Sequence, residues 1–138
     1  MLTDDRIWWR PHESDNSIGN LLLHLNGNVR QWIVVPFGGV PDARNRPAEF
    51  AEKRHIPGAE LRERLDATLL EVDEILQRME PAALLQTYDI QHQRNVTGIE
   101  AIYHVVEHFA MHHGQILYIT KLVTGQDLGF YKHLDQTK

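Results

Sequence analysis

The stretch from Tyr103 to Gln115, YHVVEHFAMHHGQ, holds four of the nine histidines of the chain. Imidazole is the commonest protein ligand for transition metals near neutral pH, so this density indicates a metal site. His104, His108 and His112 are spaced by four residues and form one stripe along a helix, because each step turns by about 40°. Two adjacent rings of such a stripe can bind one ion. The spacing leaves open whether the pair is His104 with His108 or His108 with His112.

The segment from His104 to His108 also matches H-x-x-E-H, the zinc signature of inverted metalloproteases. Those enzymes use the glutamate as a base and bind the ion with a further acidic ligand downstream. After Glu107 the sequence contains no glutamate, and its only acidic residues are Asp127 and Asp135. Glu107 also lies about 100° from His108 around a helix, on the polar face. The protease interpretation is therefore rejected.

A catalytic metal site with three protein ligands and one open position needs a third ligand from another element. His24, in the segment NLLLHLNGN, flanks an apolar helical stripe and suits this role; the alternative is a boundary histidine half in solvent. His113 lies about 100° from the stripe and is interpreted as a packed or hydrogen-bonded ring. The remaining histidines fall in predicted loops or near the ends of the chain and are predicted to be solvated: His12, His55, His92 and His133.

Composition narrows the classes of function. A chain of 138 residues is predicted to be one domain, 1–138. The net charge of -5 argues against nucleic-acid binding, which needs a basic face. No segment approaches the roughly 20 apolar residues of a membrane span, and the N-terminus lacks the apolar core of a signal peptide, so a cytoplasmic protein without membrane contact is predicted. The chain has no cysteine, so any thiol in its chemistry arrives with a substrate.

Three long helices are predicted to position the histidines. The first runs from about 17 to 35 and ends before Pro36, the second runs from Pro57 and Gly58 to Pro81, and the third runs from 98 to 124. Segment 37–47 is predicted as a loop and 48–55 as two turns of helix, while the alternation in 88–95 is too weak to predict a strand. The predicted fold class is therefore all-α, a helix bundle. A fourth helix must come from 48–55 or from a second copy of the chain.

Two motifs resemble the DinB-like (YfiT-like) family of small bacterial metal-binding helical bundles: SIGNLLLHLNGNVRQW at 17–32 and HVVEHFAMHHGQI at 104–116. In that family one metal ligand comes from the helix with the H-L motif, and two come from the H-x-x-x-H before G-Q. The resemblance therefore implies His24, His108 and His112 as metal ligands, with His104 as a neighbour. It also implies a four-helix-bundle type of fold.

The resemblance covers nearly the whole chain from about Trp8 onward. Family members usually have a full helix before the W-R-P-H segment. No such first helix is predicted in this chain, so the helix is expected either to lie upstream or to be replaced by a neighbour's surface. Members are often dimers, which implies a homodimer and agrees with the count of three long helices.

Three neutral imidazoles leave a bound ion its full 2+ charge, and they suit zinc or nickel. Candidates for residues that orient the ligands are Gln115, Asn28 and His104. The resemblance suggests an enzyme that activates a low-molecular-weight thiol for transfer to a small electrophile. Alternatives are a hydrolase that uses metal-bound hydroxide, or a non-catalytic binding or structural dimer whose metal is closed by a fourth protein ligand. Four aromatic residues either line an apolar substrate pocket or belong to the core: Trp8, Trp9, Trp32 and Tyr118.

Overall fold

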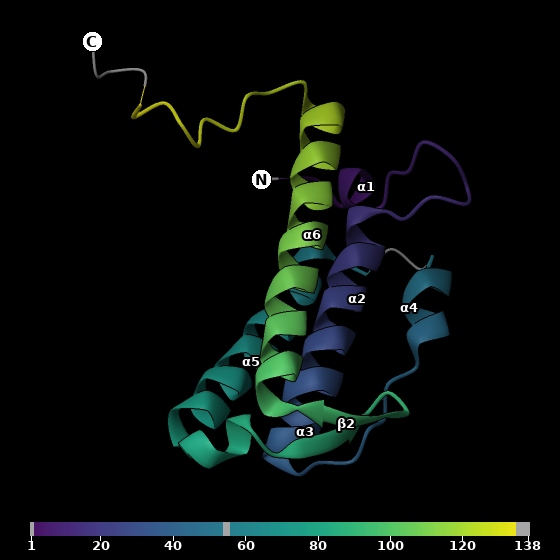
Figure 1. Cartoon of the computed structure of the whole chain (residues 1–138). Coiled ribbons are helices and arrows are strands. Elements are labelled where there is room, and N and C mark those ends of the chain that lie inside the picture. Colours follow the sequence, from purple (N-terminus) through teal and green to yellow (C-terminus); the bar gives the residue numbers. More distant parts are fainter. Residues whose placement is uncertain (1, 54–55, 135–138) are drawn as a thin grey trace.

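The computed structural model describes residues 2–53 and 56–134. Its elements in chain order are α1 (Asp4–Ile7), α2 (Ile18–Val29), a π-helical turn (Arg30–Val34), α3 (Val35–Gly38), α4 (Arg46–Ala51), α5 (Gly58–Arg78), a 3₁₀ turn (Pro81–Leu84), β1 (Thr87–Ile90), β2 (Gln93–Thr97) and α6 (Gly98–Thr124). The long helices α5 and α6 both pack against α2, and α4 lies along another side of α2 (Figure 1). The mostly helical fold confirms the prediction, while the four-helix-bundle type stays a prediction. No helix in the described ranges is long and apolar enough to cross a bilayer.

The ends of α6 are where the sequence predicts them. The Thr97 side chain accepts a hydrogen bond from the Glu100 backbone, and the Glu100 carboxylate accepts one from the Thr97 backbone, which forms a capping box. At the other end Gly125 adopts the left-handed conformation, with φ of 65°. The helix that carries the histidine stripe is thus fixed at both ends.

The sequence predicted that the first long helix ends before Pro36, and this prediction is wrong. The helix widens into the π-helical turn Arg30–Val34 and continues as α3, with Pro36 in the first turn. The backbone N–H of Val35 donates to the carbonyl of Arg30, which is one residue farther back than in an α-helix. Because a proline ring clashes with the carbonyl four residues before it in an α-helix, the wider turn accommodates Pro36 without breaking the helix.

A β-hairpin, which the sequence analysis did not predict, connects α5 to α6. β1 and β2 pair antiparallel around a two-residue loop, Gln91 and His92, whose φ angles are 54° and 63°. Hairpin loops of this conformation favour glycine and asparagine, so Gln-His carries a weak sequence signal. The hairpin stabilises the core through Ile90, which is buried against Trp32.

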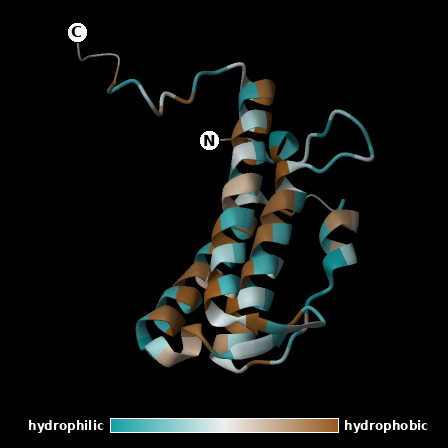
Figure 2. Cartoon of the chain, viewed as in Figure 1, coloured by the Kyte–Doolittle hydropathy of each residue, from teal (hydrophilic) through white to brown (hydrophobic). Residues whose placement is uncertain are grey.

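The core is built around α2 and its continuation. The apolar sides of the long helices face one another (Figure 2). Trp8 can pack on α2 because position 19 is glycine: a Cβ at Gly19 would lie 2.8 Å from the indole ring. The indole Nε1 of Trp8 donates to the carbonyl of Ile56 at 2.8 Å. Large fully buried side chains from this helix include Leu21, Leu25, Val29, Ile33 and Val34.

Candidate metal centre

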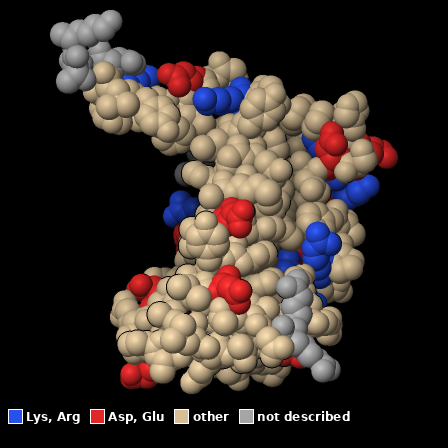
Figure 3. Space-filling view, viewed as in Figure 1, with Lys and Arg blue, Asp and Glu red and all other residues tan. Residues whose placement is uncertain are grey.

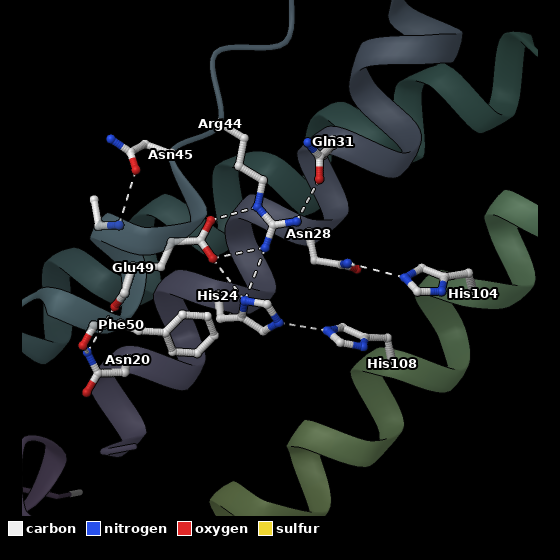
Figure 4. A network of polar contacts seen from close by, with 11 residues as sticks. Asn20, His24, Asn28, Gln31, Arg44, Asn45, Glu49, Phe50, His104 and His108 are labelled. Atoms are coloured by element: carbon white, nitrogen blue, oxygen red, sulfur yellow. Dashed lines mark hydrogen bonds and ion pairs between the residues drawn. The ribbon is translucent and has the colours of Figure 1, made fainter. Parts of the chain in front are cut away.

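Three histidine rings converge between α2 and α6. His24 comes from α2, whereas His108 and His112 lie one turn apart on α6, and one ring nitrogen from each lies within 4.8 Å of the other two. The Nε2 atoms of His24 and His108 are 2.9 Å apart (Figure 4). The ring centroids of His24 and His112 are 5.0 Å apart. The structure therefore brings together the three residues that the resemblance implied, from segments far apart in the sequence.

Burial favours the neutral form of the His108 and His112 rings. His24 is 3% exposed and His112 is 9% exposed, while His108 is half-buried. Burial lowers the pKa of His108 to about 4, and the adjacent His112 and His24 add to this shift. Burial also lowers the pKa of His112, although its hydrogen bond to Gln115 opposes the change. A neutral imidazole has the free lone pair that a metal ligand needs.

Hydrogen-bond acceptors determine which nitrogen of two rings carries the proton. The carboxylate Oε2 of Glu49 lies 2.9 Å from Nδ1 of His24. The amide Oε1 of Gln115 lies 2.7 Å from Nδ1 of His112. Because these oxygens can only accept, we assign the proton of both rings to Nδ1, which leaves Nε2 as the nitrogen with the lone pair.

The residues present fit a divalent metal ion. Zinc binds histidine nitrogens at about 2.0–2.1 Å in a tetrahedron, which separates two ligand nitrogens by about 3.3 Å. The 2.9 Å between His24 and His108 needs only a small side-chain rotation to reach that spacing. An all-imidazole set without thiolates suits zinc and nickel. Within the described ranges the cluster contains these three ligand groups and no fourth one from histidine, cysteine, aspartate or glutamate.

The three candidate neighbours take different places. Gln115 contacts a predicted ligand, because it accepts the hydrogen bond from His112. Asn28 and His104 instead meet each other, with Nδ2 of Asn28 3.3 Å from Nε2 of His104 (Figure 4). The ring of His104 stacks on that of His108, with centroids 5.3 Å apart, and on Trp32, with centroids 3.8 Å apart. Asn28 and His104 therefore form a layer one helical turn from the three converging rings.

The sequence analysis missed Glu49 and Arg44. Glu49 lies on the short helix α4, and Arg44 lies in the loop before it, yet their side chains are 10% and 5% exposed. Burial raises the pKa of Glu49, but hydrogen bonds from Arg44 and His24 outweigh this effect and hold it below its usual value. No spacing rule links a residue of this short helix to His24. The only signal in the sequence that marked this region was a helical turn capped by Asn45 and rich in charged residues.

The other predicted residues are mostly where they were expected. Glu107 is exposed, as predicted, but His113 is exposed rather than packed, because its angular offset from the stripe points it outward. Trp8 and Trp32 belong to the core. His12, His92 and His133 are exposed as predicted, and His55 lies outside the described residues. Trp9, Tyr118 and Gln115 help to line a cavity of about 300 Å³.

Comparison with known proteins places this sequence in a family. The profile of a family described as "Protein of unknown function (DUF1572)" matches residues 1–133. The chain belongs to the DUF1572 family. No curated protein matches this DUF1572 sequence.

A solved structure has the same fold as this DUF1572 chain. It is described as the crystal structure of "the conserved protein of locus from Enterococcus faecalis" and aligns with a TM-score of 0.71. The alignment covers 91% of this chain and 85% of the other, at 19% sequence identity. At that identity the likeness concerns the fold alone.

Proposed function

We propose that the chain binds one divalent metal ion, zinc or nickel, through His24, His108 and His112, and that it is an enzyme. The observation that carries the proposal is the convergence of three imidazoles without a fourth protein ligand among the described residues. Structural zinc sites are closed by four protein ligands, whereas catalytic sites keep one position open. The three-histidine donor set therefore favours a catalytic metal site over a structural one.

The proposed reaction is transfer of a low-molecular-weight thiol to a small electrophile. A divalent ion with an open position lowers the pKa of a thiol or a water that binds there. The thiol must be a cosubstrate, because the chain contains no cysteine. In the transfer, the sulfur forms a bond to an electrophilic carbon, the leaving group departs with its electron pair, and the thiol proton passes to solvent. The motifs shared with DinB-like proteins support this class of reaction.

An apolar cavity that shares Gln115 with the surroundings of the centre supports a small-molecule substrate. Trp9 and Tyr118 line it together with Gln115, whose side chain also accepts a hydrogen bond from His112. Cavities of about 300 Å³ with aromatic walls and a few polar groups are typical of small-ligand sites. We propose that the electrophile binds there.

The test combines metal analysis with a thiol panel. Tag-free protein is expected to contain about one ion per chain, and His108→Ala is expected to lose it, whereas His113→Ala, which changes an exposed neighbour, is expected to keep it.

Metal-loaded protein is then mixed with biological thiols and monochlorobimane, from which chloride departs. Metal-dependent acceleration supports thiol transfer. Bound metal without acceleration, but with ester or amide hydrolysis, indicates the hydrolase. Bound metal without either reaction indicates a binding protein.

We also propose that the chain forms a homodimer through the outer face of α6. Tyr103, Val106 and Tyr118 on this helix are 70%, 62% and 65% exposed. Charged side chains are sparse over α6 (Figure 3), which has only Glu100, Glu107 and Lys121. This face carries exposed apolar side chains beside Glu107 and Lys121, and exposed apolar side chains gathered on one face mark interaction sites.

A further inference from the structure

We propose that Glu49, held by Arg44, is the positioning residue for His24, and that Gly27 is the place on α2 that admits this ion pair. The inference rests on the proposed metal site and adds the residues that prepare one of its ligands. Metal-binding histidines usually donate their second ring N–H to a carboxylate or carbonyl, which orients the ring.

The Glu49 carboxylate is held in place from two sides. It accepts from Nδ1 of His24 at 2.9 Å, so the opposite nitrogen of that ring points toward His108. Arg44 donates to both carboxylate oxygens, through Nε at 2.7 Å and through Nη2 at 2.9 Å. Such a bidentate pair restricts the carboxylate in angle as well as in distance. Figure 4 shows that Arg44, Glu49 and His24 all contact one another.

Arg44 also lies close to the same nitrogen of His24. Its Nη2 lies 3.1 Å from Nδ1 of His24, and a guanidinium is always charged and can only donate. The nearer carboxylate, at 2.9 Å, is the stronger partner, so the ring donates to Glu49. Arg44 in turn donates through Nη1 to Oε1 of Gln31 at 2.8 Å, which anchors the guanidinium on the π-helical turn.

The backbone of α2 provides the space for this pair. A Cβ at Gly27 would lie 2.1 Å from Oε1 of Glu49 and 2.9 Å from Nε of Arg44. Only glycine lets the carboxylate approach α2 one turn beyond His24. The fully buried Asn20 holds α4 against α2, because its Nδ2 donates to the carbonyls of Glu49 at 2.9 Å and Glu52 at 3.2 Å.

The alternative is that the ion pair only attaches α4 to α2. The two roles differ in what a substitution changes. Loss of an attachment lowers the stability of the protein and leaves the ring of His24 free to bind metal. Loss of a positioning residue changes the tautomer of His24 and the metal affinity. Zinc affinity and the ¹⁵N chemical shifts of the ring nitrogens therefore distinguish the two roles.

The first test compares Glu49→Gln with Glu60→Gln, since Glu60 forms an exposed ion pair with Arg64 on α5. Affinity for Zn²⁺ alone is measured by competition with a chromophoric chelator. Glu49→Gln is expected to weaken binding roughly 10–100-fold, and Glu60→Gln is expected to leave it unchanged. Gly27→Ala keeps every polar group but displaces the carboxylate, so it should weaken binding too. Its control is Gly114→Ala, where an added Cβ meets no atom within 4 Å. Parental affinity in both Glu49→Gln and Gly27→Ala overturns the inference.

The second test uses metal-free protein and so does not depend on the proposed function. The ¹⁵N shifts of His24 are expected to report a proton on Nδ1 in the parent, and a shift toward the Nε2–H tautomer in Glu49→Ala. An Nε2–H tautomer in the parent overturns the inference even if metal binds. If the parent binds no metal but shows the Nδ1–H tautomer, the proposed function fails while the positioning contact stands.

Discussion

At the scale of single residues, the candidate centre depends on which protons its histidines hold. Acceptors fix the proton on Nδ1 of His24 and His112, and burial lowers the pKa of His108 and His112. The spacing of His104, His108 and His112 predicted a stripe, and the resemblance selected its members together with His24. Glu49 could not be predicted, because it reaches His24 only when α4 folds back along α2.

These pKa shifts predict how the stability of the metal-free chain depends on pH. An unfolded histidine titrates near 6.5, whereas the folded pKa values of His104, His108 and His112 are lowered. The unfolded chain therefore binds more protons, so the free energy of unfolding should decrease as pH falls from about 7 to about 4. Urea denaturation at several pH values measures this. His108→Leu should flatten the dependence, and a stability that is constant or increases toward pH 5 would contradict the assignment.

A second prediction concerns the contact between Gln115 and His112. Gln115→Leu removes the acceptor for Nδ1 at similar volume, so the ring can change tautomer. We expect the affinity for Zn²⁺ to fall roughly tenfold, toward the lower end of effects seen for such partners. The melting temperature should change little, since Gln115 is largely exposed. Isothermal titration with Zn²⁺ measures the effect, and an affinity equal to that of the parent would contradict it.

At the scale of elements, the sequence predicted the helix ends that are specified by side chains. It missed the features that depend on an unusual backbone conformation. Thr97 and Gly125 carry clear signals, so α6 was predicted correctly. Pro36 signals a helix end, but the π-helical turn relieves its clash. The hairpin loop is formed by Gln91 and His92, whereas glycine and asparagine are the residues that mark such loops in a sequence, so the hairpin had no clear local signal.

The junction between the hairpin and α6 yields a prediction about packing. A Cβ at Gly98 would lie 2.3 Å from the backbone carbonyl oxygen of Ala83, and backbone cannot move aside as a flexible side chain can. Gly98→Ala should therefore destabilise the protein by about 1–3 kcal/mol. Gly114→Ala on the same helix should be neutral or should stabilise it by up to about 1 kcal/mol. Chemical denaturation compares the two, and equal stabilities would contradict the close approach.

At the scale of the whole molecule, α2 lies at the centre and α6 at the surface. The side of α6 that faces α2 presents the histidines, and its opposite side presents exposed apolar residues such as Tyr103 and Val106. One helix therefore serves both the candidate centre and the proposed dimer face. Because the histidines point away from that face, the two functions are separable by mutation.

Sedimentation analysis tests the dimer. Val106→Glu places a charge in the middle of the proposed interface, where burying it without a partner is costly. We expect the variant to sediment as a monomer at concentrations at which the parent is a dimer, and to retain its metal. Leu70→Glu is the control, because Leu70 is 67% exposed on α5, away from the outer face of α6. A parent that sediments as a monomer, or a Val106→Glu variant that stays dimeric, would contradict the proposal.

The ring stack that runs from Trp32 through His104 to His108 makes the protein its own optical probe. The indole lies one aromatic ring away from a predicted ligand. Open-shell ions such as Ni²⁺ quench the emission of a nearby indole, whereas closed-shell Zn²⁺ does not. Tryptophan fluorescence, with Trp32→Phe to subtract the signal of the other indoles, should therefore fall when Ni²⁺ fills the centre and stay unchanged when Zn²⁺ is added, which distinguishes the two metals.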